Sequence, residues 1–145
     1  MTNKRILENA ASTLLDPLAR EQLQGLDWLE LSTNAGSDHY PVVTVGSGPP
    51  VLLLHGFDSS NLEFRRLVPL LKTNNTLIIP DLFGFGFCPR PEQTSYGPEL
   101  VLNHLDALLD PEAGRPVDRT VEMQDRAGEG RRRRAGRRIL VGGIA

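Results

Sequence analysis

Two short runs made almost entirely of apolar residues constrain the fold of this 145-residue chain more than any other feature. Residues 51–54 read Val-Leu-Leu-Leu, and residues 76–80 read Thr-Leu-Ile-Ile-Pro. Neither run alternates apolar with polar residues, which indicates strands covered on both faces, as in a parallel sheet. Between them, residues 61–72 carry apolar side chains spaced along one helix face, namely Phe64, Leu67, Val68 and Leu71. The pattern predicts a strand–helix–strand unit, and Pro69 should kink its helix or restart it one turn before the end.

The flanking segments extend this unit to the opening of a doubly wound α/β sheet. Residues 26–31 and the β-branched run 40–45 predict an antiparallel hairpin around a turn-rich stretch at 32–37. Another helix is predicted from Pro98 to about residue 110. A third parallel strand should follow, but residues 111–138 contain no Leu, Ile or aromatic residue. Only the short run 139–141 could begin such a strand.

Three segments follow from these patterns. Residues 1–25 predict an N-terminal helical extension, residues 26–110 a partial α/β core, and residues 111–145 an Arg-rich tail. The tail holds 9 Arg and 5 Asp and Glu, whereas residues 1–110 hold 7 Lys and Arg and 13 Asp and Glu. With so few apolar side chains, the tail is expected to be disordered or to be non-native sequence from an altered reading frame.

Two predicted loops contain residue patterns that indicate a functional site. Residues 55 and 56 form a His-Gly dipeptide between a buried strand and a helix start where Ser60 and Glu63 predict a capping box. Residues 80–88 read Pro-Asp-Leu-Phe-Gly-Phe-Gly-Phe-Cys. Both segments resemble the α/β-hydrolases, the first their oxyanion loop and the second their Asp-x-x-Gly-x-Gly-x-Ser segment, with Cys88 where Ser is usual. The resemblance covers about residues 26–110.

The resemblance implies the N-terminal half of an α/β-hydrolase fold and an acyl- or ester-type hydrolase acting on a small molecule. The backbone N–H of Phe57 would be one donor of an oxyanion hole. The implied oxyanion and substrate-pocket residues are His55, Gly56, Phe57, Asp58, Gly84, Phe85 and Gly86. His55 would hold the loop and would not abstract a proton. The alternative is that the His-Gly dipeptide merely turns the chain.

The nucleophile of such a site is missing. None of the seven serines lies in a Gly-x-Ser-x-Gly elbow. The nearest partial match to this motif, at residues 140–145, has Ile144 at the position of the nucleophile. No catalytic residue is therefore assigned, and the chain is expected to be an inactive hydrolase fragment. Among the remaining candidates, His104 is expected on the polar face of its helix and Asp58 as a helix cap, while Asp81 would fix its loop and Cys88 would not be a nucleophile.

Other functional classes fit less well. Gly84-x-Gly86 runs into Pro89 and Pro91, so no helix opens where a dinucleotide pyrophosphate would bind. A non-enzymatic protein whose basic tail binds a polyanion remains the alternative, although the tail lacks aromatic residues and nucleic acid is not an expected partner. Neither a cofactor nor a metal site is expected. A single cysteine and the lack of a long apolar run favour a cytoplasmic protein without a membrane partner.

Overall fold

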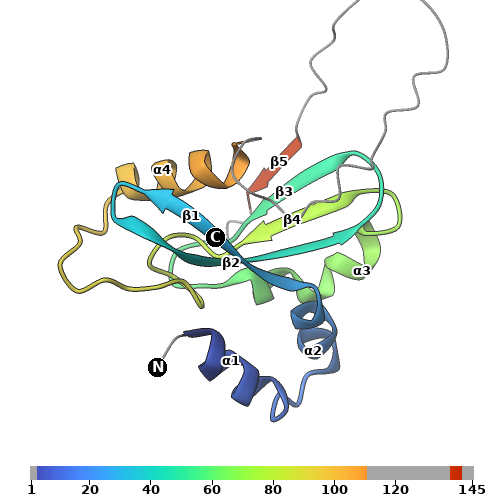
Figure 1. Cartoon of the computed structure of the whole chain (residues 1–145). Helices are drawn as coiled ribbons and strands as arrows, with labels where there is room; N and C mark the ends of the chain where they lie inside the picture. The colour runs from blue at the N-terminus through green and yellow to red at the C-terminus, as the bar shows by residue number, and fades with distance from the viewer. Residues whose placement is uncertain (1–2, 111–137, 142–145) are drawn as a thin grey trace, which may run out of the picture.

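The computed structural model describes residues 3–110 and 138–141. Its centre is a five-stranded sheet in the order β1-β2-β4-β3-β5, drawn in Figure 1. The strands are β1 (Leu26–Thr33), β2 (Gly36–Gly46), β3 (Pro50–Leu54), β4 (Thr76–Pro80) and β5 (Arg138–Val141). The helices are α1 (Asn3–Ala11), α2 (Pro17–Gln24), the 3-10 helix η1 (Asn61–Arg66), α3 (Val68–Leu71) and α4 (Pro98–Leu109).

The predicted hairpin is confirmed, with strands longer than the sequence suggested. β1 and β2 pair antiparallel from Leu26 opposite Val43 to Thr33 opposite Gly36. The turn is therefore much tighter than the predicted stretch 32–37. The hydroxyls of Ser32 and Ser37 hydrogen bond to each other at 2.8 Å across the two strands, so these polar residues continue the ladder.

The predicted parallel pair is also confirmed. β3 pairs parallel with β4, with Val51 opposite Leu77, and β4 pairs antiparallel with β2 on its other side. The third parallel strand is β5, which pairs with the other edge of β3. It lies in the run that the sequence marked as a candidate strand start, within the segment assigned to the tail. Residues 111–137 and 142–145 lie outside the described part of the chain, so the domain boundary at residue 110 stays a prediction.

Helices cover both faces of the sheet, as a doubly wound α/β arrangement requires. Neighbouring residues of β2 serve opposite faces because side chains alternate along a strand. Val42 packs into the core beneath α4, which includes Leu29, Leu31, Tyr40, Phe83, Cys88 and Leu108. Val43 packs into the core beneath η1 and α3, which includes Val51, Leu53, Phe64, Val68, Leu77 and Ile79. In Figure 1, α4 lies on one side of the sheet and α3 on the other.

Two helix predictions need correction. The single helix expected over residues 61–72 is the 3-10 helix η1 followed by the four-residue α3, with a break at Leu67. Pro69 lies in the first turn of α3, where its missing N–H costs nothing. His104 was expected on a polar helix face but is completely buried, because α4 turns it onto the rings of Tyr40 and Phe83.

Helix α2 links the N-terminal segment to the rest of the protein. Residue 16 caps α2, and α2 packs against η1. In the part of the chain that the structure describes, no helix has both the length and the apolar character needed to cross a bilayer.

Candidate oxyanion loop

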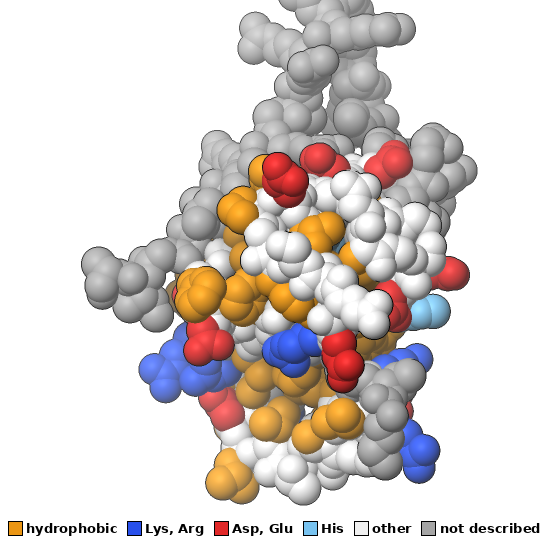
Figure 2. All heavy atoms as spheres, turned by 90° about the vertical axis from the view of Figure 1, so that its left-hand side faces the viewer, with side chains coloured by type: hydrophobic (Ala, Val, Ile, Leu, Met, Phe, Trp, Pro, Cys, Tyr) orange, Lys and Arg blue, Asp and Glu red, His pale blue; other side chains and the backbone are white. Residues whose placement is uncertain are grey.

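The candidate site lies where β3 and β4 end. Since these strands are parallel neighbours, their carboxyl ends meet at one edge of the sheet, the usual place for a site in open α/β sheets. His55 directly follows β3 and Asp81 directly follows β4, and both side chains are buried. Figure 2 views the molecule from the side toward which the β4 arrow points in Figure 1, and hydrophobic side chains gather there among acidic and basic groups.

His55 ties the two loops together. Its Nε2 accepts a hydrogen bond from the backbone N–H of Leu82 at 2.9 Å. The proton must then sit on Nδ1, which donates to the carbonyl oxygen of Gly56 at 2.7 Å. Both ring nitrogens are occupied, so His55 has no free lone pair with which to abstract a proton. This agrees with its interpretation as a residue that holds the loop.

The first two backbone N–H groups of the loop after His55 differ in their partners. The N–H of Gly56 donates to Oε2 of Glu63 at 3.1 Å. The N–H of Phe57 has no hydrogen-bond partner among the described residues, and the side chain of Phe57 is 90% exposed. The ring of Phe57 meets the ring of Phe85 edge-on, with centroids 5.2 Å apart. A backbone N–H in this position is free to donate to a bound oxygen atom.

Asp58 is not a helix cap, contrary to the sequence prediction. Its backbone has a φ of 56°, in the left-handed region, and reverses the chain before η1 begins. Ser60 is the cap, and its hydroxyl accepts from the N–H of Leu62 at 3.3 Å. The predicted capping box is half right, because Glu63 reaches back to Gly56 and not to the backbone of Ser60.

Asp81 holds the second loop, as the sequence predicted. Its Oδ1 accepts from the backbone N–H of Asn61 at 2.5 Å and from Nδ2 of the same residue at 2.8 Å. Its Oδ2 accepts from the N–H of Phe87 at 2.7 Å. Burial raises the pKa of this carboxyl, and the donated N–H bonds oppose that rise. One carboxylate thus joins the start of η1 to the Gly84–Gly86 segment.

Gly84 and Gly86 let that segment fold tightly. Both have positive φ, 82° and 54°. A β-carbon on Gly84 would strike the ring of Tyr96, and one on Gly86 would strike the carboxyl group of Asp81. Arg90 holds the segment from outside, donating from Nε to the carbonyl of Gly84 at 3.0 Å and from Nη2 to that of Gly86 at 2.9 Å.

The structure therefore brings the sequence-selected residues into one loop cluster. Phe85 bridges its two halves, with its ring 6.3 Å from that of His55 and in contact with that of Phe57. Two cavities, of about 170 and 310 Å³, lie elsewhere, beside α2 and beside α1. Within the described ranges, no three His, Cys, Asp or Glu side chains gather as a metal site.

Cys88 supports this cluster and does not act as a nucleophile in it. The thiol is buried and donates to the backbone carbonyl of Asp81 at 3.3 Å. Burial raises the pKa of Cys88 far above neutrality, so the thiol stays protonated.

Sequence reasoning missed three supporting residues. Asn61 and Arg90 were not singled out, and Glu63 was predicted only as a capping-box partner. Their partners lie in other segments of the chain, so no local pattern marked Asn61 or Arg90. For Glu63 the only signal was an acid seven residues after Gly56.

The molecule is an α/β protein, with a mixed sheet, helices on both faces and two polar loops at the ends of parallel strands. In open α/β sheets, binding sites lie at this edge. In sequence and fold, about half of the chain is similar to the α/β-hydrolases. It is 39% identical over 71 residues to an uncharacterized hydrolase of Saccharomyces cerevisiae, covering 49% of this chain and 24% of the relative. It is 37% identical over 82 residues to the cis-3-alkyl-4-alkyloxetan-2-one decarboxylase of Shewanella oneidensis, covering 55% and 25%.

Solved structures give the same assignment. The epoxide hydrolase VrEH1 of Vigna radiata matches with a TM-score of 0.50 and 27% identity, over 59% of this chain and 28% of that structure. An epoxide hydrolase of the α/β-hydrolase superfamily from metagenomes of hot environments matches with a TM-score of 0.50 and 26% identity, over 57% and 28%. No family model matches the chain. The matched stretch spans about a quarter of the length of these relatives.

Proposed function

We propose that this chain supplies the oxyanion-loop half of a hydrolase site for a small molecule of acyl or ester type. The N–H of Phe57, which has no partner among residues 3–110 and 138–141, is the observation that supports this most, since the loop around it is held by His55, Glu63 and Asp81. Relatives named as a soluble epoxide hydrolase, a lipase and a haloalkane dehalogenase fit a small-molecule substrate.

The chemistry of the loop follows from where charge develops. When a carbonyl carbon is attacked, its oxygen becomes negative, and a preorganised N–H stabilises that charge by roughly 3 kcal/mol. Gly56 has no side chain to keep a substrate from the backbone. The proposed oxyanion and substrate-pocket residues are His55, Gly56, Phe57, Asp58, Gly84, Phe85 and Gly86. Among them the N–H of Phe57 would donate, and the rings of Phe57 and Phe85 would contact the apolar part of the substrate.

We further propose that the 145-residue chain does not turn over such a substrate by itself. It contains no Gly-x-Ser-x-Gly elbow. The ring nitrogens of His55 are both engaged, and the thiol of Cys88 is buried and protonated. An activated nucleophile needs a neighbouring base or a lowered pKa, and neither residue offers one.

A nitrophenyl-ester assay tests the inactivity. The purified chain, mixed with nitrophenyl acetate and separately with a fluorophosphonate, should release nitrophenol no faster than buffer and should gain no mass. Turnover together with a covalent adduct on one of its own side chains would contradict this part of the proposal.

Titration with an alkyl phosphonate, an anionic mimic of the tetrahedral state, tests the oxyanion loop. The amide resonance of Phe57 should shift selectively in a ¹⁵N NMR spectrum. Phe57→Ala keeps the N–H and should keep binding, whereas Phe57→Pro removes the N–H and should abolish the response of the neighbouring Gly56 amide. Equal responses of the two variants would exclude the N–H as the donor.

Polyanion binding by the Arg-rich tail remains the second candidate, supported by the contrast between nine Arg in residues 111–145 and an acidic remainder. Nearly all of that tail lies outside the described residues. Salt-sensitive binding to DNA that disappears when residues 111–145 are deleted would favour it over the hydrolase proposal.

A further inference from the structure

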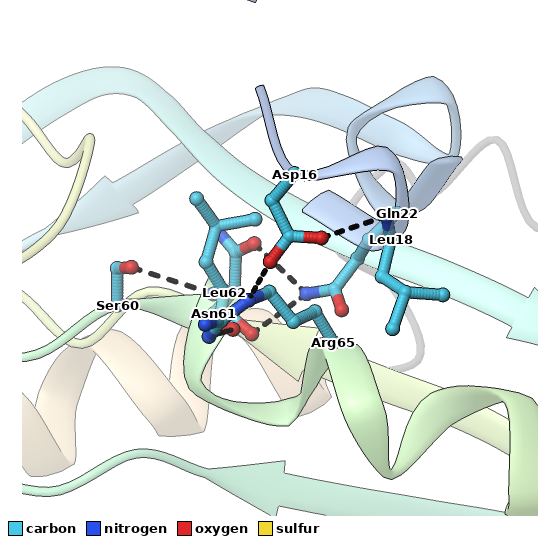
Figure 3. Close-up of polar contacts among 7 residues, drawn as sticks. All are labelled: Asp16, Leu18, Gln22, Ser60, Asn61, Leu62 and Arg65. Carbon is cyan, nitrogen blue, oxygen red and sulfur yellow. Dashed lines mark hydrogen bonds and ion pairs between the residues drawn. The ribbon is translucent and has the colours of Figure 1, made fainter. Parts of the chain in front are cut away.

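Helix α2 reaches the candidate site through a buried hydrogen-bond relay. Nε2 of Gln22, on α2, donates to the backbone carbonyl of Asn61 at 2.6 Å and lies 3.2 Å from its Oδ1. Asn61 in turn donates twice to Asp81, which accepts from Phe87 on the second loop. Gln22, Asn61 and Asp81 are all buried. Figure 3 shows Gln22 of α2 directed at Asn61, the first residue of η1.

A second link joins the same two elements at a more exposed position. Asp16 accepts from the N–H of Leu18 at 2.9 Å, capping α2, and its other oxygen pairs with Nε of Arg65 at 2.6 Å. Nη1 of Arg65 donates to the carbonyl of Leu62 at 3.1 Å. Figure 3 shows both links side by side. The first turn of η1 is therefore held from outside by α2.

The placement of η1 decides the geometry of the loop in two ways. Glu63, two residues after Asn61, is the acceptor for the N–H of Gly56. Asn61 carries two of the three hydrogen bonds that reach the carboxylate of Asp81. A rotation of η1 would move the Glu63 acceptor and the two Asn61 donors, and the N–H of Phe57 with them.

Burying Gln22 has a cost that this arrangement must offset. Its Oε1 is buried without a hydrogen-bond partner in the structure. An unsatisfied buried acceptor costs about 1–3 kcal/mol. If the side chain served only to pack against η1, an apolar side chain of the same length would avoid this cost. Its donor side is fully used, since Nε2 meets two oxygens of Asn61.

We propose that Gln22 is a positioning residue for the oxyanion loop, acting through Asn61 and Asp81, with Asp16 and Arg65 as a second clamp from α2. This rests on the proposed function of the loop. The segment 1–25, which the sequence set apart as an extension, would then belong to the working part of the site.

Amide hydrogen exchange on the full chain tests the relay without any need for activity. In Gln22→Met, which keeps the side-chain length and removes the amide, the amides of Asn61 and Phe87 should exchange about fivefold faster, the factor that one hydrogen bond of ordinary net strength supports. Amides of β2 and β4 should keep their protection. Uniform acceleration of all amides, or no change at Asn61 and Phe87, would overturn the relay.

Glu21→Gln is the matched control. Glu21 also lies on α2 and pairs with Lys72 at 2.7 Å, but neither residue touches the loop. It should leave the Asn61 and Phe87 amides unchanged. Should Gln22→Met fail to fold, Asp16→Asn replaces it, since Asn still caps α2 but loses the ion pair with Arg65. Unchanged loop amides in Asp16→Asn would then count against the proposal.

The phosphonate titration separates this inference from the proposed function. In Gln22→Met the phosphonate should bind about fivefold more weakly than in the wild type, and Glu21→Gln should match the wild type. If the wild-type Phe57 amide ignores the phosphonate, the function proposal fails, while the exchange data still decide whether α2 positions the loop.

Discussion

Single residues at the carboxyl ends of β3 and β4 determine what this loop pair can do. His55 and Asp81 are buried polar groups whose hydrogen-bonding atoms are all engaged with backbone or with Asn61. A buried polar group that loses its partner costs about 1–3 kcal/mol, so each of them strongly favours one loop conformation. The N–H of Phe57 is the opposite case, because it has no hydrogen-bond partner in the part of the chain that the structure describes.

Gly86→Ala should destabilise the protein. The φ of 54° is unfavourable for alanine by about 1–2 kcal/mol, and the new methyl group would also press on the carboxyl group of Asp81. The midpoint of urea unfolding should fall accordingly. Gly97→Ala is the control, because no atom lies within 4 Å of its added β-carbon. Equal losses in the two variants would argue against a special role for the conformation of Gly86.

His104 should make the stability depend on pH. Burial among Tyr40 and Phe83 lowers the pKa of His104 to about 4 from its ordinary value of 6.5, and both ring nitrogens are buried without a partner. The unfolded chain therefore binds a proton that the folded chain does not between these pH values. The contribution of His104 to the free energy of unfolding is fully present above about pH 6.5. It is lost as the pH falls toward 4, by roughly 3 kcal/mol in total.

Urea unfolding at several pH values measures this effect. The buried carboxyl of Asp81 has a raised pKa and contributes with the opposite sign, so the comparison must be with His104→Leu at each pH. The unfolding free energy of the wild type minus that of His104→Leu should rise by roughly 3 kcal/mol as the pH rises from 4 to 6.5. A difference that stays constant with pH would show that His104 does not titrate in this way.

At the scale of elements, local patterns were enough for β3, β4 and α4, because the signals for each lie within a dozen residues. The turn between β1 and β2 was predicted too long, because the polar residues Ser32 and Ser37 continue the ladder. The break between η1 and α3 was only partly predicted, because Pro69 signals a discontinuity but not the 3-10 geometry before it.

Contacts between elements could not be predicted from local patterns. Gln22 contacts Asn61, 39 residues away in the sequence, and Asp16 contacts Arg65, 49 residues away.

Asp81→Asn tests whether this carboxylate holds η1 and the Gly84–Gly86 segment together. The NH₂ of the new amide would face at least one N–H group that now donates to the carboxylate, and two donors cannot pair. The η1 helix and the Gly84–Gly86 segment should therefore separate. The amides of Asn61 and Phe87 should lose protection more than in Gln22→Met, while an unchanged exchange pattern would show that other contacts hold these loops.

At the scale of the whole molecule, β5 completes the sheet from a distant part of the chain. It covers the edge of β3, from Val51 to Leu54, with a parallel pairing. An uncovered apolar edge strand is a template for association between copies. The hydrogen-bonding edge of β3 is therefore protected only while residues 138–141 stay in place.

Deleting residues 138–145 should expose that edge and promote self-association. Sedimentation velocity should show higher-order species, and a dye that binds apolar surface should fluoresce more strongly. Deleting residues 142–145 alone keeps β5 and serves as the control. A monomeric 138–145 deletion variant would mean that β5 does not protect the sheet.

By itself, the sequence determined the α/β class, the strand–helix–strand core and the two loops that follow its strands, because hydrophobic periodicity and Gly and Pro positions act over a few residues. Tertiary structure alone decided that His104 is buried, that Asp58 turns the chain while Ser60 caps, and that Gln22, Asn61 and Asp81 form one relay. These outcomes depend on which distant groups meet when the sheet and helices pack, and burial makes each unpaired polar atom expensive only after that packing has formed.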